Sequence, residues 1–485
     1  MGLLPYFLEY FKINNLTFYF LLFLFALPLA ASGLKFLRLS WTQAFVMVLL
    51  LGMALRIGWI ATSSHEPQWT WQSNSIENDW INIHATELTH GTWFHNPAGH
   101  PSGRRPIGYP LFLGGLYALF GSKAAVAWTA HLILFAASAI LIFLIGRRTF
   151  GERAGFLAAF FFCIYPISIY STRLITDEHL FLPVWYLGLY LILREADGPQ
   201  PKPWSWLWYG LCFGYAVMIR THAIFMPGVL LIARFCMKRP WKETLRVTLL
   251  TGAVMLAVNL PWAVRNYRAW NVPVLFTATG CNVYMQVNDT ALPRESEGRI
   301  PGPADPGFSP ELQKALASGN EGLSHQICNR EMKRWIIHNP AKFIFLGARK
   351  LLLFMSWNRS AGVWPLWYQY TEGHFDPARP LSPAAKKILE ELAFAFYYIL
   401  LFSYLLSLIL LPASWKKLGS NSRKGILILG TCVLFWLLEH LLIAPDRKYR
   451  FPLEPLMMLS ASSFWIWLVD NASGVMAKIR SRRTG

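Results

Sequence analysis

Long apolar runs recur along most of the chain, and they constrain its fold more than any other feature. A helix needs about 17–25 mostly apolar residues to cross a bilayer, and it satisfies its own backbone hydrogen bonds inside lipid. Of the 485 residues, 54% are hydrophobic and 15% are charged, whereas soluble domains carry about 25% charged residues. The sequence therefore predicts an all-α polytopic membrane protein. We expect about eleven spanning helices, at residues 16–33, 42–62, 122–146, 155–172, 179–194, 205–220, 223–237, 244–262, 390–412, 425–443 and 452–470.

The basic residues indicate how these helices are oriented. Much of the formal net charge of +19 sits in short clusters between apolar runs, which is typical of cytoplasmic loops and not of a nucleic-acid surface. We therefore expect no nucleic-acid partner. If the loop with Lys35 and Arg38 is cytoplasmic, the opposite, outer face receives two long regions that do not span, residues 63–121 and 263–389. The cytoplasmic face then receives residues 147–154, 195–204, 238–243, 413–424 and 471–485.

Three features leave alternatives open. The first apolar run is a cleaved signal peptide or a retained helix, and its weakly basic start favours the helix. Residues 339–357 are interfacial or re-entrant, because Arg349 and Lys350 interrupt their apolar pattern. Cys281 and Cys328 both fall in the outer region, where an oxidising compartment permits a disulfide, although their spacing in sequence does not set their distance in space.

An acidic stretch follows the second apolar run. "ENDWINIHATELTHG" carries Glu77 and Asp79 just before a segment with near-helical apolar spacing. An aspartate at a helix start is commonly an N-cap. Here it also lies just past a membrane helix, where partial desolvation tunes the basicity of a carboxylate. Asp79 is therefore our candidate general base.

A second acidic element is expected at a hairpin tip on the same face. "YSTRLITDEHLF" places Asp177 and Glu178 in a short turn between two predicted spanning helices. Charges at such a turn can simply mark the membrane interface. They can also face Asp79 across one cavity, and both interpretations remain open.

Cations on the outer face run against the usual distribution of charge, which favours the cytoplasmic side. The segment "APDRKYRFPLEP" is the clearest case, and such cations suit a lipid phosphate, which arginine binds through a bidentate fork. The candidate phosphate ligands are Arg447, Lys448 and Arg450, with Arg104, Arg105 and Arg265.

Carboxylates and cations on one face match the needs of glycosyl transfer from a lipid phosphate. A carboxylate base removes the proton of the acceptor hydroxyl as that hydroxyl attacks. Fixed cations stabilise the negative charge that grows on the leaving phosphate. A flippase or transporter for lipid-linked sugars is the alternative of a different class, because it also needs cations for lipid phosphate. The sequence shows no internal repeat of the kind common in transporters.

The order of several short motifs resembles one family, the C-type multi-membrane-spanning glycosyltransferases. Within it, the chain is most similar to the bacterial group related to protein O-mannosyltransferases and lipid A aminoarabinose transferases. The motifs are "LLLGMALRIGW", "NDWINIHATELTHG", "RPIGYPLFLGGLYALFG", "YSTRLITDEHLFL", "LPWAVRNYRAWNVPVLFTATGCNVYM", "HNPAKFIFLGARK" and "RKYRFPLEP".

The resemblance implies roles for individual residues. Asp79 takes the position of the catalytic base, with Glu77 as the fallback because Trp80 and Ile83 depart from the commoner pattern. Asp177 or Glu178 takes a second acidic position, which in relatives lies near the substrate or a divalent ion. The cations of residues 447–450 match a basic motif that lies late in the family's sequences, near the donor phosphate. No cofactor is required, and a divalent metal ion is left as an option.

The resemblance also implies an inverting enzyme of the bacterial inner membrane whose site faces the periplasm. Its partners would be a polyprenyl-phosphate-linked sugar, an acceptor hydroxyl on a glycan, lipid or protein, and the membrane lipids. An O-antigen ligase or polymerase, which uses a diphosphate-linked donor, is a further alternative. We expect the GT-C fold in three parts: residues 1–262 with the catalytic loop 63–121, the periplasmic region 263–389, and the C-terminal helices 390–485.

Overall fold

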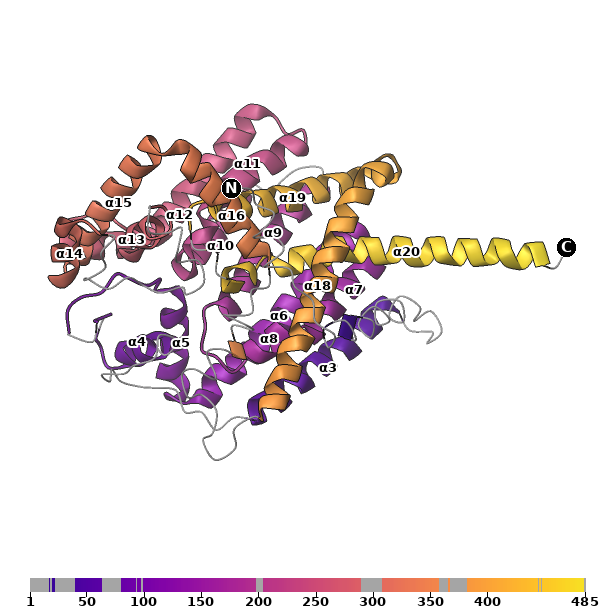
Figure 1. The fold of residues 1–485 in the computed structure, drawn as a ribbon, viewed down its shortest axis with the longest axis horizontal. Coiled ribbons are helices and arrows are strands. Elements are labelled where there is room, and N and C mark those ends of the chain that lie inside the picture. Colours follow the sequence, from indigo (N-terminus) through magenta and orange to yellow (C-terminus); the bar gives the residue numbers. More distant parts are fainter. Residues whose placement is uncertain are drawn as a thin grey trace.

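The structure, a computed structural model, is helical throughout its regular parts (Figure 1). Within the residues that it describes, the one pairing of extended chain is an isolated bridge between His95 and Pro101. These residues are 17, 20–21, 40–62, 80–92, 94–96, 99–197, 204–288, 308–356, 365–366, 382–443, 445 and 447–483.

The all-α membrane fold is confirmed. In the described part of the chain, five helices are long and apolar enough to cross a bilayer, while the total of about eleven remains a prediction. The five are α3 (Trp41–Ala61), α6 (Ala124–Phe150), α12 (Trp241–Trp270), α18 (Pro383–Ser414) and α19 (Ser420–Glu439). Beside them lie α7 (Glu152–Ile164), α8 (Pro166–Ser171), α9 (Glu178–Asp197), α10 (Ser205–Ile219), η2 (Thr221–Phe225), α11 (Met226–Cys236) and α20 (Glu454–Arg483).

Two prolines lie where helices differ from the predicted spans, while α18 also starts earlier, at Pro383, and α20 continues past residue 470 to Arg483. The expected span 155–172 is broken in two, because Tyr165 takes the extended conformation imposed by the following Pro166, which starts α8. At the span expected to end at residue 262, a proline does not interrupt the helix. Pro261 lies inside α12, and the helix continues to a left-handed cap at Asn271, with φ 54°.

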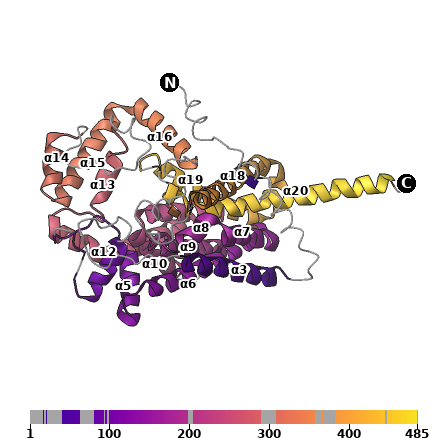
Figure 2. The same cartoon turned by 60° about the horizontal axis from the view of Figure 1, so that its bottom comes forward.

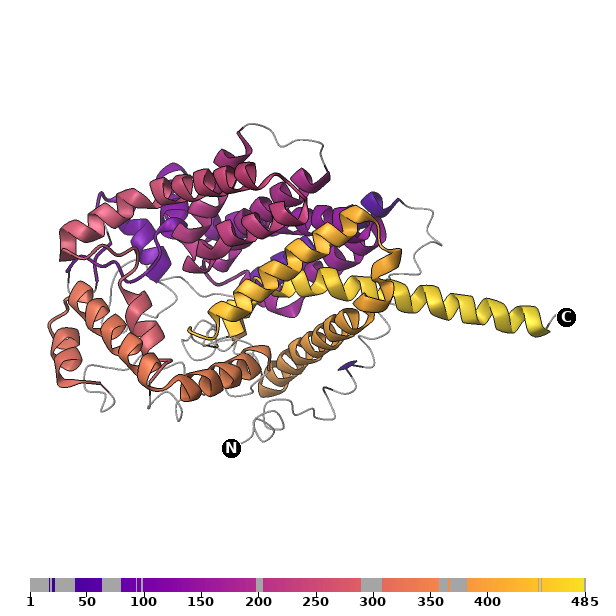
Figure 3. The same ribbon diagram turned by 90° about the horizontal axis from the view of Figure 1, so that it is seen from above.

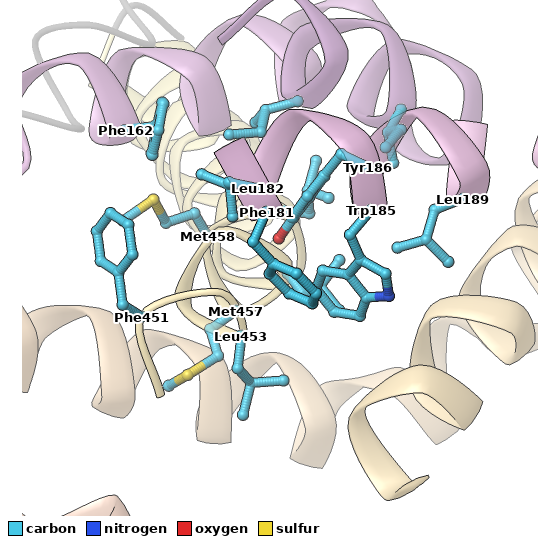
Figure 4. Packing of buried hydrophobic residues seen from close by; sticks show 14 of the residues in the cluster. Phe162, Phe181, Leu182, Trp185, Tyr186, Leu189, Phe451, Leu453, Met457 and Met458 are labelled. Carbon is cyan, nitrogen blue, oxygen red and sulfur yellow. The ribbon is translucent and has the colours of Figure 1, made fainter. Parts of the chain in front are cut away.

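One buried apolar core joins most of these helices. Figure 4 shows its centre, where Trp185 and Tyr186 of α9 lie against Leu453 and Met457 at the start of α20. The Tyr186 hydroxyl donates to the carbonyl oxygen of Pro452 at 3.0 Å. The late segment around residue 450 is thereby held against α9, and this contact positions the site described below.

The region after α12 forms a second, smaller cluster. Its helices are α13 (Ala278–Tyr284), α14 (Pro310–Ala317), α15 (Glu321–His338) and α16 (Pro340–Met355). Cys281 and Cys328 are joined in a disulfide that ties α13 to α15, so the disulfide expected as one alternative is confirmed.

The two ends of the molecule differ. All three views place α13–α15 at one end, while the C-terminal part of α20 projects from the other (Figures 1, 2 and 3). The short helices α4 (Trp80–Thr89) and α5 (Gly108–Phe120) lie at the α13–α15 end. Of the first expected span, only Thr17, Phe20 and Leu21 are among the described residues, and they are helical.

Candidate active site

The acidic turn between α8 and α9 is buried. Glu178 is the first residue of α9 and has no exposed surface, and Asp177 precedes it. The turn is held from both sides: Nε2 of His179 donates to the carbonyl of Ser171 at 2.9 Å, and the Trp128 indole donates to the carbonyl of Arg173 at 3.0 Å. These contacts fix the two carboxylates.

Arg220, at the end of α10, binds both carboxylates. Its Nε and Nη2 donate to Oδ1 of Asp177 at 3.1 and 2.7 Å, and Nη2 also donates to Oε1 of Glu178. The extended backbone of Arg220, which caps α10, turns the chain toward η2. We did not select Arg220 from the sequence. The signal was present, because it is a cation that ends an apolar run on the predicted outer face, as in residues 447–450.

The three groups change each other's ionisation. Burial raises the pKa of Glu178, and the charge of Asp177 raises it further, against the opposing effect of Arg220. Burial also favours a raised pKa for Asp177, but the charge and hydrogen bonds of Arg220 outweigh it and hold that pKa below its ordinary value. Asp177 therefore keeps its charge while Glu178 retains a proton more readily.

The 3-10 turn η4 (Arg447–Arg450) brings the late basic motif to this turn. The guanidinium of Arg220 lies 5.5 Å from the ring centre of Tyr449. The charge of Lys448 acts on both Asp177 and Glu178. Two elements predicted separately from the sequence therefore meet. The side chain of Arg447 is outside the described part.

Arg450 has a different environment. It is buried, and Nε donates to Glu454 at 2.9 Å while Nη1 donates to the carbonyls of Phe354 and Ser356 at 2.6 and 2.8 Å. Its guanidinium also lies 3.7 Å from the ring centre of Tyr397. These contacts join η4 to α16, α18 and α20. They indicate an anchor for η4, and a direct role in phosphate binding stays untested.

Arg265 is also bound by neighbouring groups of the protein. It donates to the carbonyls of Ser102 and Phe94 at 2.9 and 3.2 Å, and its guanidinium lies 4.7 Å from the ring centre of Trp262. It thereby fixes the segment that leads into α5. The structure does not show it in contact with the acidic turn.

The predicted pair Arg104 and Arg105 lies in that same segment, just before α5. A Cβ on Gly108 would lie 2.8 Å from the backbone nitrogen of Ile219, so the start of α5 closely approaches the end of α10 beside Arg220. Arg104 is exposed, and the guanidinium of Arg105 lies 5.4 Å from the ring centre of Trp80.

The two residues predicted as bases, Asp79 and Glu77, lie outside the described residues. The described chain resumes at Trp80, the first residue of α4. The Tyr117 hydroxyl donates to Asn82 at 2.5 Å, which holds α4 against α5. The role of Asp79 remains a prediction.

A small cavity lies beneath the acidic turn. Its polar lining includes Arg56, Ser168, Thr172, Glu178 and His179. Arg56 comes from α3 and is fully buried. Its Nη1 donates to the carbonyl of Cys163 at 2.9 Å, and its Nη2 donates to the Ser168 hydroxyl at 2.6 Å. Arg56 therefore lines the same cavity as Glu178.

A metal site cannot be assembled from the described residues. They contain no group of three or more His, Cys, Asp or Glu side chains placed to hold an ion. Asp177 and Glu178 are instead bound to Arg220. We therefore derive no step that involves a metal.

Comparison with known sequences identifies part of the chain. Residues 104–264 match the family described as dolichyl-phosphate-mannose-protein mannosyltransferase. This segment runs from the start of α5 into α12, and it contains Asp177, Glu178 and Arg220 but not η4. No curated protein sequence matches the chain.

Similar solved structures come from an archaeon and a bacterium. One is the oligosaccharyltransferase AglB from Archaeoglobus fulgidus in complex with an inhibitory peptide and a dolichol-phosphate, with 13% identity, a TM-score of 0.47, and coverage of 93% of this chain and 52% of that one. The apo form of the Archaeoglobus fulgidus enzyme has 15% identity, a TM-score of 0.49, and coverage of 93% and 52%.

The chain spans about half the length of these archaeal structures. ArnT from Cupriavidus metallidurans bound to undecaprenyl phosphate has 18% identity, a TM-score of 0.37, and coverage of 90% of this chain and 79% of that one. Over residues 104–264, the family match confirms the expected resemblance to membrane-embedded glycosyltransferases that include the protein mannosyltransferases.

Proposed function

We propose that the protein is an inverting glycosyltransferase that uses a polyprenyl-phosphate-linked sugar at the periplasmic face of a bacterial inner membrane. The observation that carries this proposal is the meeting of Arg220 and Lys448 with the acidic turn, Asp177 and Glu178. Two cations at the ends of apolar helices suit a phosphate at the depth of lipid headgroups. The family match over residues 104–264 supports a lipid-phosphate donor.

The reaction we propose is a direct displacement. The oxygen of an acceptor hydroxyl bonds to the anomeric carbon, and the hydroxyl proton passes to the Asp79 carboxylate. The bond from that carbon to the phosphate oxygen breaks, and its electron pair leaves with the lipid phosphate. Attack from the face opposite the leaving group inverts the anomeric centre.

Arg220 and Lys448 are proposed to stabilise the leaving phosphate. Nη1 of Arg220 is buried and has no hydrogen-bond partner within the described residues, so one donor of its fork is available. Fixed donors aimed at a developing charge are effective because they need no rearrangement during the reaction. Asp177 and Glu178 would act as positioning residues that hold the guanidinium in place.

The acceptor would be a hydroxyl on a glycan, lipid or protein, reached from the side of α13–α16. A flippase would use the same cations to move a lipid-linked sugar across the bilayer. An O-antigen ligase or polymerase would require a diphosphate-linked donor.

A reconstitution assay separates these functions. The purified protein, in liposomes, is given polyprenyl phosphate carrying a labelled sugar, together with extracted periplasmic acceptors. We expect label to leave the lipid and appear in an acceptor. Redistribution of intact donor across the bilayer without product would replace the proposal with a flippase. Product formed only from the diphosphate-linked donor would replace it with a ligase or polymerase.

Asp79→Asn tests the base. We expect this variant to fold and bind donor but to lose transfer by at least about a hundredfold, because general-base catalysis contributes about 10²–10⁴-fold. The matched control is Glu87→Gln, a carboxylate on α4 that contacts Nδ1 of His84 at 2.8 Å. Full transfer by Asp79→Asn would reject Asp79, and loss of transfer in Glu77→Gln alone would move the role to Glu77.

A further inference from the structure

The charge around Arg220 is largely balanced by its neighbours. Arg220 forms ion pairs with both Asp177 and Glu178. A phosphate placed beside it therefore meets a cation that is already paired with the charged Asp177 and bound to Glu178, which weakens the net attraction. An additional cation from a neighbouring element would strengthen phosphate binding, and α16 carries one.

Lys350 is a buried amine, and the described residues offer its nitrogen no hydrogen-bond partner. Its side chain is 4% exposed, and its Nζ has no hydrogen-bond partner among the residues that the structure describes. Burial lowers the pKa of Lys350 to about 7. An unpaired ammonium is costly in a protein interior, and an unsatisfied buried group of this kind calls for an explanation in a functional site.

The face of α16 that carries Lys350 lies against the end of α19. Positions three and four apart share a helix face, so Gly347, Lys350 and Phe354 lie in one row. A Cβ on Gly347 would lie 3.1 Å from the Leu441 side chain. The ring of Phe354 lies 4.0 Å from that of His440, centre to centre, and the charge of Lys350 acts on His440.

His440 lies between Lys350 on α16 and the groups around the acidic turn. Its Nδ1 donates to the carbonyl of Trp436 at 2.7 Å, so Nε2 of the neutral ring is an acceptor and does not repel an ammonium beside it. The ring centre of Tyr449 lies 6.4 Å from that of His440, the guanidinium of Arg220 lies 5.5 Å from the ring centre of Tyr449, and the charge of Arg220 also acts on His440. Lys350 and Arg220 therefore reach the same neighbourhood from α16 and α10.

We propose that Lys350 is a phosphate-binding residue whose ammonium binds an oxyanion of the lipid-linked donor, beside Tyr449 and together with Arg220 and Lys448. This inference rests on the proposed function, because it assigns a ligand to the same site. It also explains why a lysine interrupts the apolar pattern of residues 339–357. A bound oxyanion supplies the partner that Nζ lacks among the described residues.

Binding to the full-length protein in nanodiscs tests the assignment. The probe is undecaprenyl phosphate, and its dissociation constant is measured for the wild type, Lys350→Met, Lys350→Arg and Lys342→Met. Lys342 lies two turns earlier on α16 and is exposed, so Lys342→Met is the matched control. We expect Lys350→Met to weaken binding by about tenfold or more, the usual effect of losing a charged hydrogen bond. Lys350→Arg and Lys342→Met should bind nearly as the wild type does.

The pH dependence of binding separates a direct contact from a structural role. Above about pH 7 the free wild type must take up a proton to present an ammonium, so its affinity should fall by up to tenfold per pH unit relative to Lys350→Arg. The other ionisable groups near Lys350 are unchanged in the variants, so the difference in pH dependence between wild type and Lys350→Arg comes from Lys350. They are His222, His440, Glu439, Arg220, Asp177, Glu178, Lys448, Tyr449, Arg450 and Glu454.

The possible outcomes are distinct. If the wild type binds undecaprenyl phosphate and Lys350→Met binds it equally well, the role of Lys350 is rejected while the proposed function stands. If the wild type does not bind or use a lipid phosphate, the proposed function fails first. Competition by millimolar inorganic phosphate that is lost in Lys350→Met would assign the subsite to free phosphate and overturn the lipid assignment. Lys350→Met should fold at least as stably as the wild type, because it removes a buried amine that has no hydrogen-bond partner among the described residues.

Discussion

At the scale of single residues, the site depends on one arginine shared by two carboxylates. Asp177 and Glu178 were predicted as site residues because, with Arg173, they place three ionisable residues in one short turn between apolar runs. Arg220 was not predicted: its place at the end of an apolar run was visible, but its pairing with the start of α9 leaves no local pattern in the sequence. The contacts of Arg450 with the carbonyls of Phe354 and Ser356 were equally hidden, because a sequence shows a cation but not its partners.

Glu178 should make stability depend on pH. Its pKa is raised above the ordinary 4.5 in the fold, so the folded protein holds a proton that the unfolded chain loses. This contribution is complete below about pH 4.5 and is lost as pH rises through the higher folded pKa. We expect the thermal midpoint of the wild type to fall from pH 5 to pH 8 more steeply than that of Glu178→Gln, measured in nanodiscs. Equal slopes would contradict the assignment, and Glu311→Gln, at an exposed position, should keep the wild-type slope.

At the scale of elements, α15 is attached to the segment before α5 through one carboxylate. Glu321 accepts hydrogen bonds from the Ser102 hydroxyl at 2.9 Å, the Gly103 backbone nitrogen at 2.9 Å and the Thr277 hydroxyl at 2.6 Å. The disulfide between Cys281 and Cys328 then ties α15 to α13. Through this attachment, α13 and α15 help to set the position of α5 beside Arg220.

Glu321→Ala should therefore impair transfer from a distance. Hydrogen bonds to a charged group contribute about 1.5–3 kcal/mol each, so losing the carboxylate should lower transfer by about tenfold or more, with Glu321→Gln in between. The matched control is Glu311→Ala on α14, whose ion pair with Arg330 is exposed on both sides and contributes about 0–1 kcal/mol. Initial rates with saturating donor are the measurement. Equal rates in Glu321→Ala and Glu311→Ala would show that the attachment does not matter for transfer.

The elements themselves were largely predictable from the sequence, and two of the exceptions lie at prolines. Apolar length located α3, α6 and α19 to within about five residues, whereas α18 begins at Pro383, before the expected start at residue 390. Proline has opposite outcomes at two places. Pro166 does interrupt a helix, whereas Pro261 is carried inside α12. A proline reports a missing donor and a steric restriction, but neighbouring packing decides whether the helix continues.

At the scale of the whole molecule, the two ends are distinguished by charge and by structure. Arg153, at the start of α7, forms an ion pair with Asp470 of α20 at 2.7 Å, and Arg234 forms ion pairs with Glu195 and Glu243. These contacts join helix ends in or beside segments that the positive-inside rule assigns to the cytoplasm. The disulfide and the contacts of Glu321 lie at the other end, with α13–α15.

This arrangement predicts which end meets the periplasm. Glu152 and Glu311 are both exposed, and they lie at the start of α7 and on α14. In a background without the four free cysteines, a membrane-impermeant maleimide should label Glu311→Cys in intact spheroplasts and Glu152→Cys only after lysis. The physical reason is that Lys and Arg near helix ends are retained on the cytoplasmic side during insertion. Labelling of Glu152→Cys in intact spheroplasts would invert the molecule. Arg220, Lys448 and the acidic turn would then have to meet their lipid phosphate from the cytoplasm, and a periplasmic transferase would no longer fit.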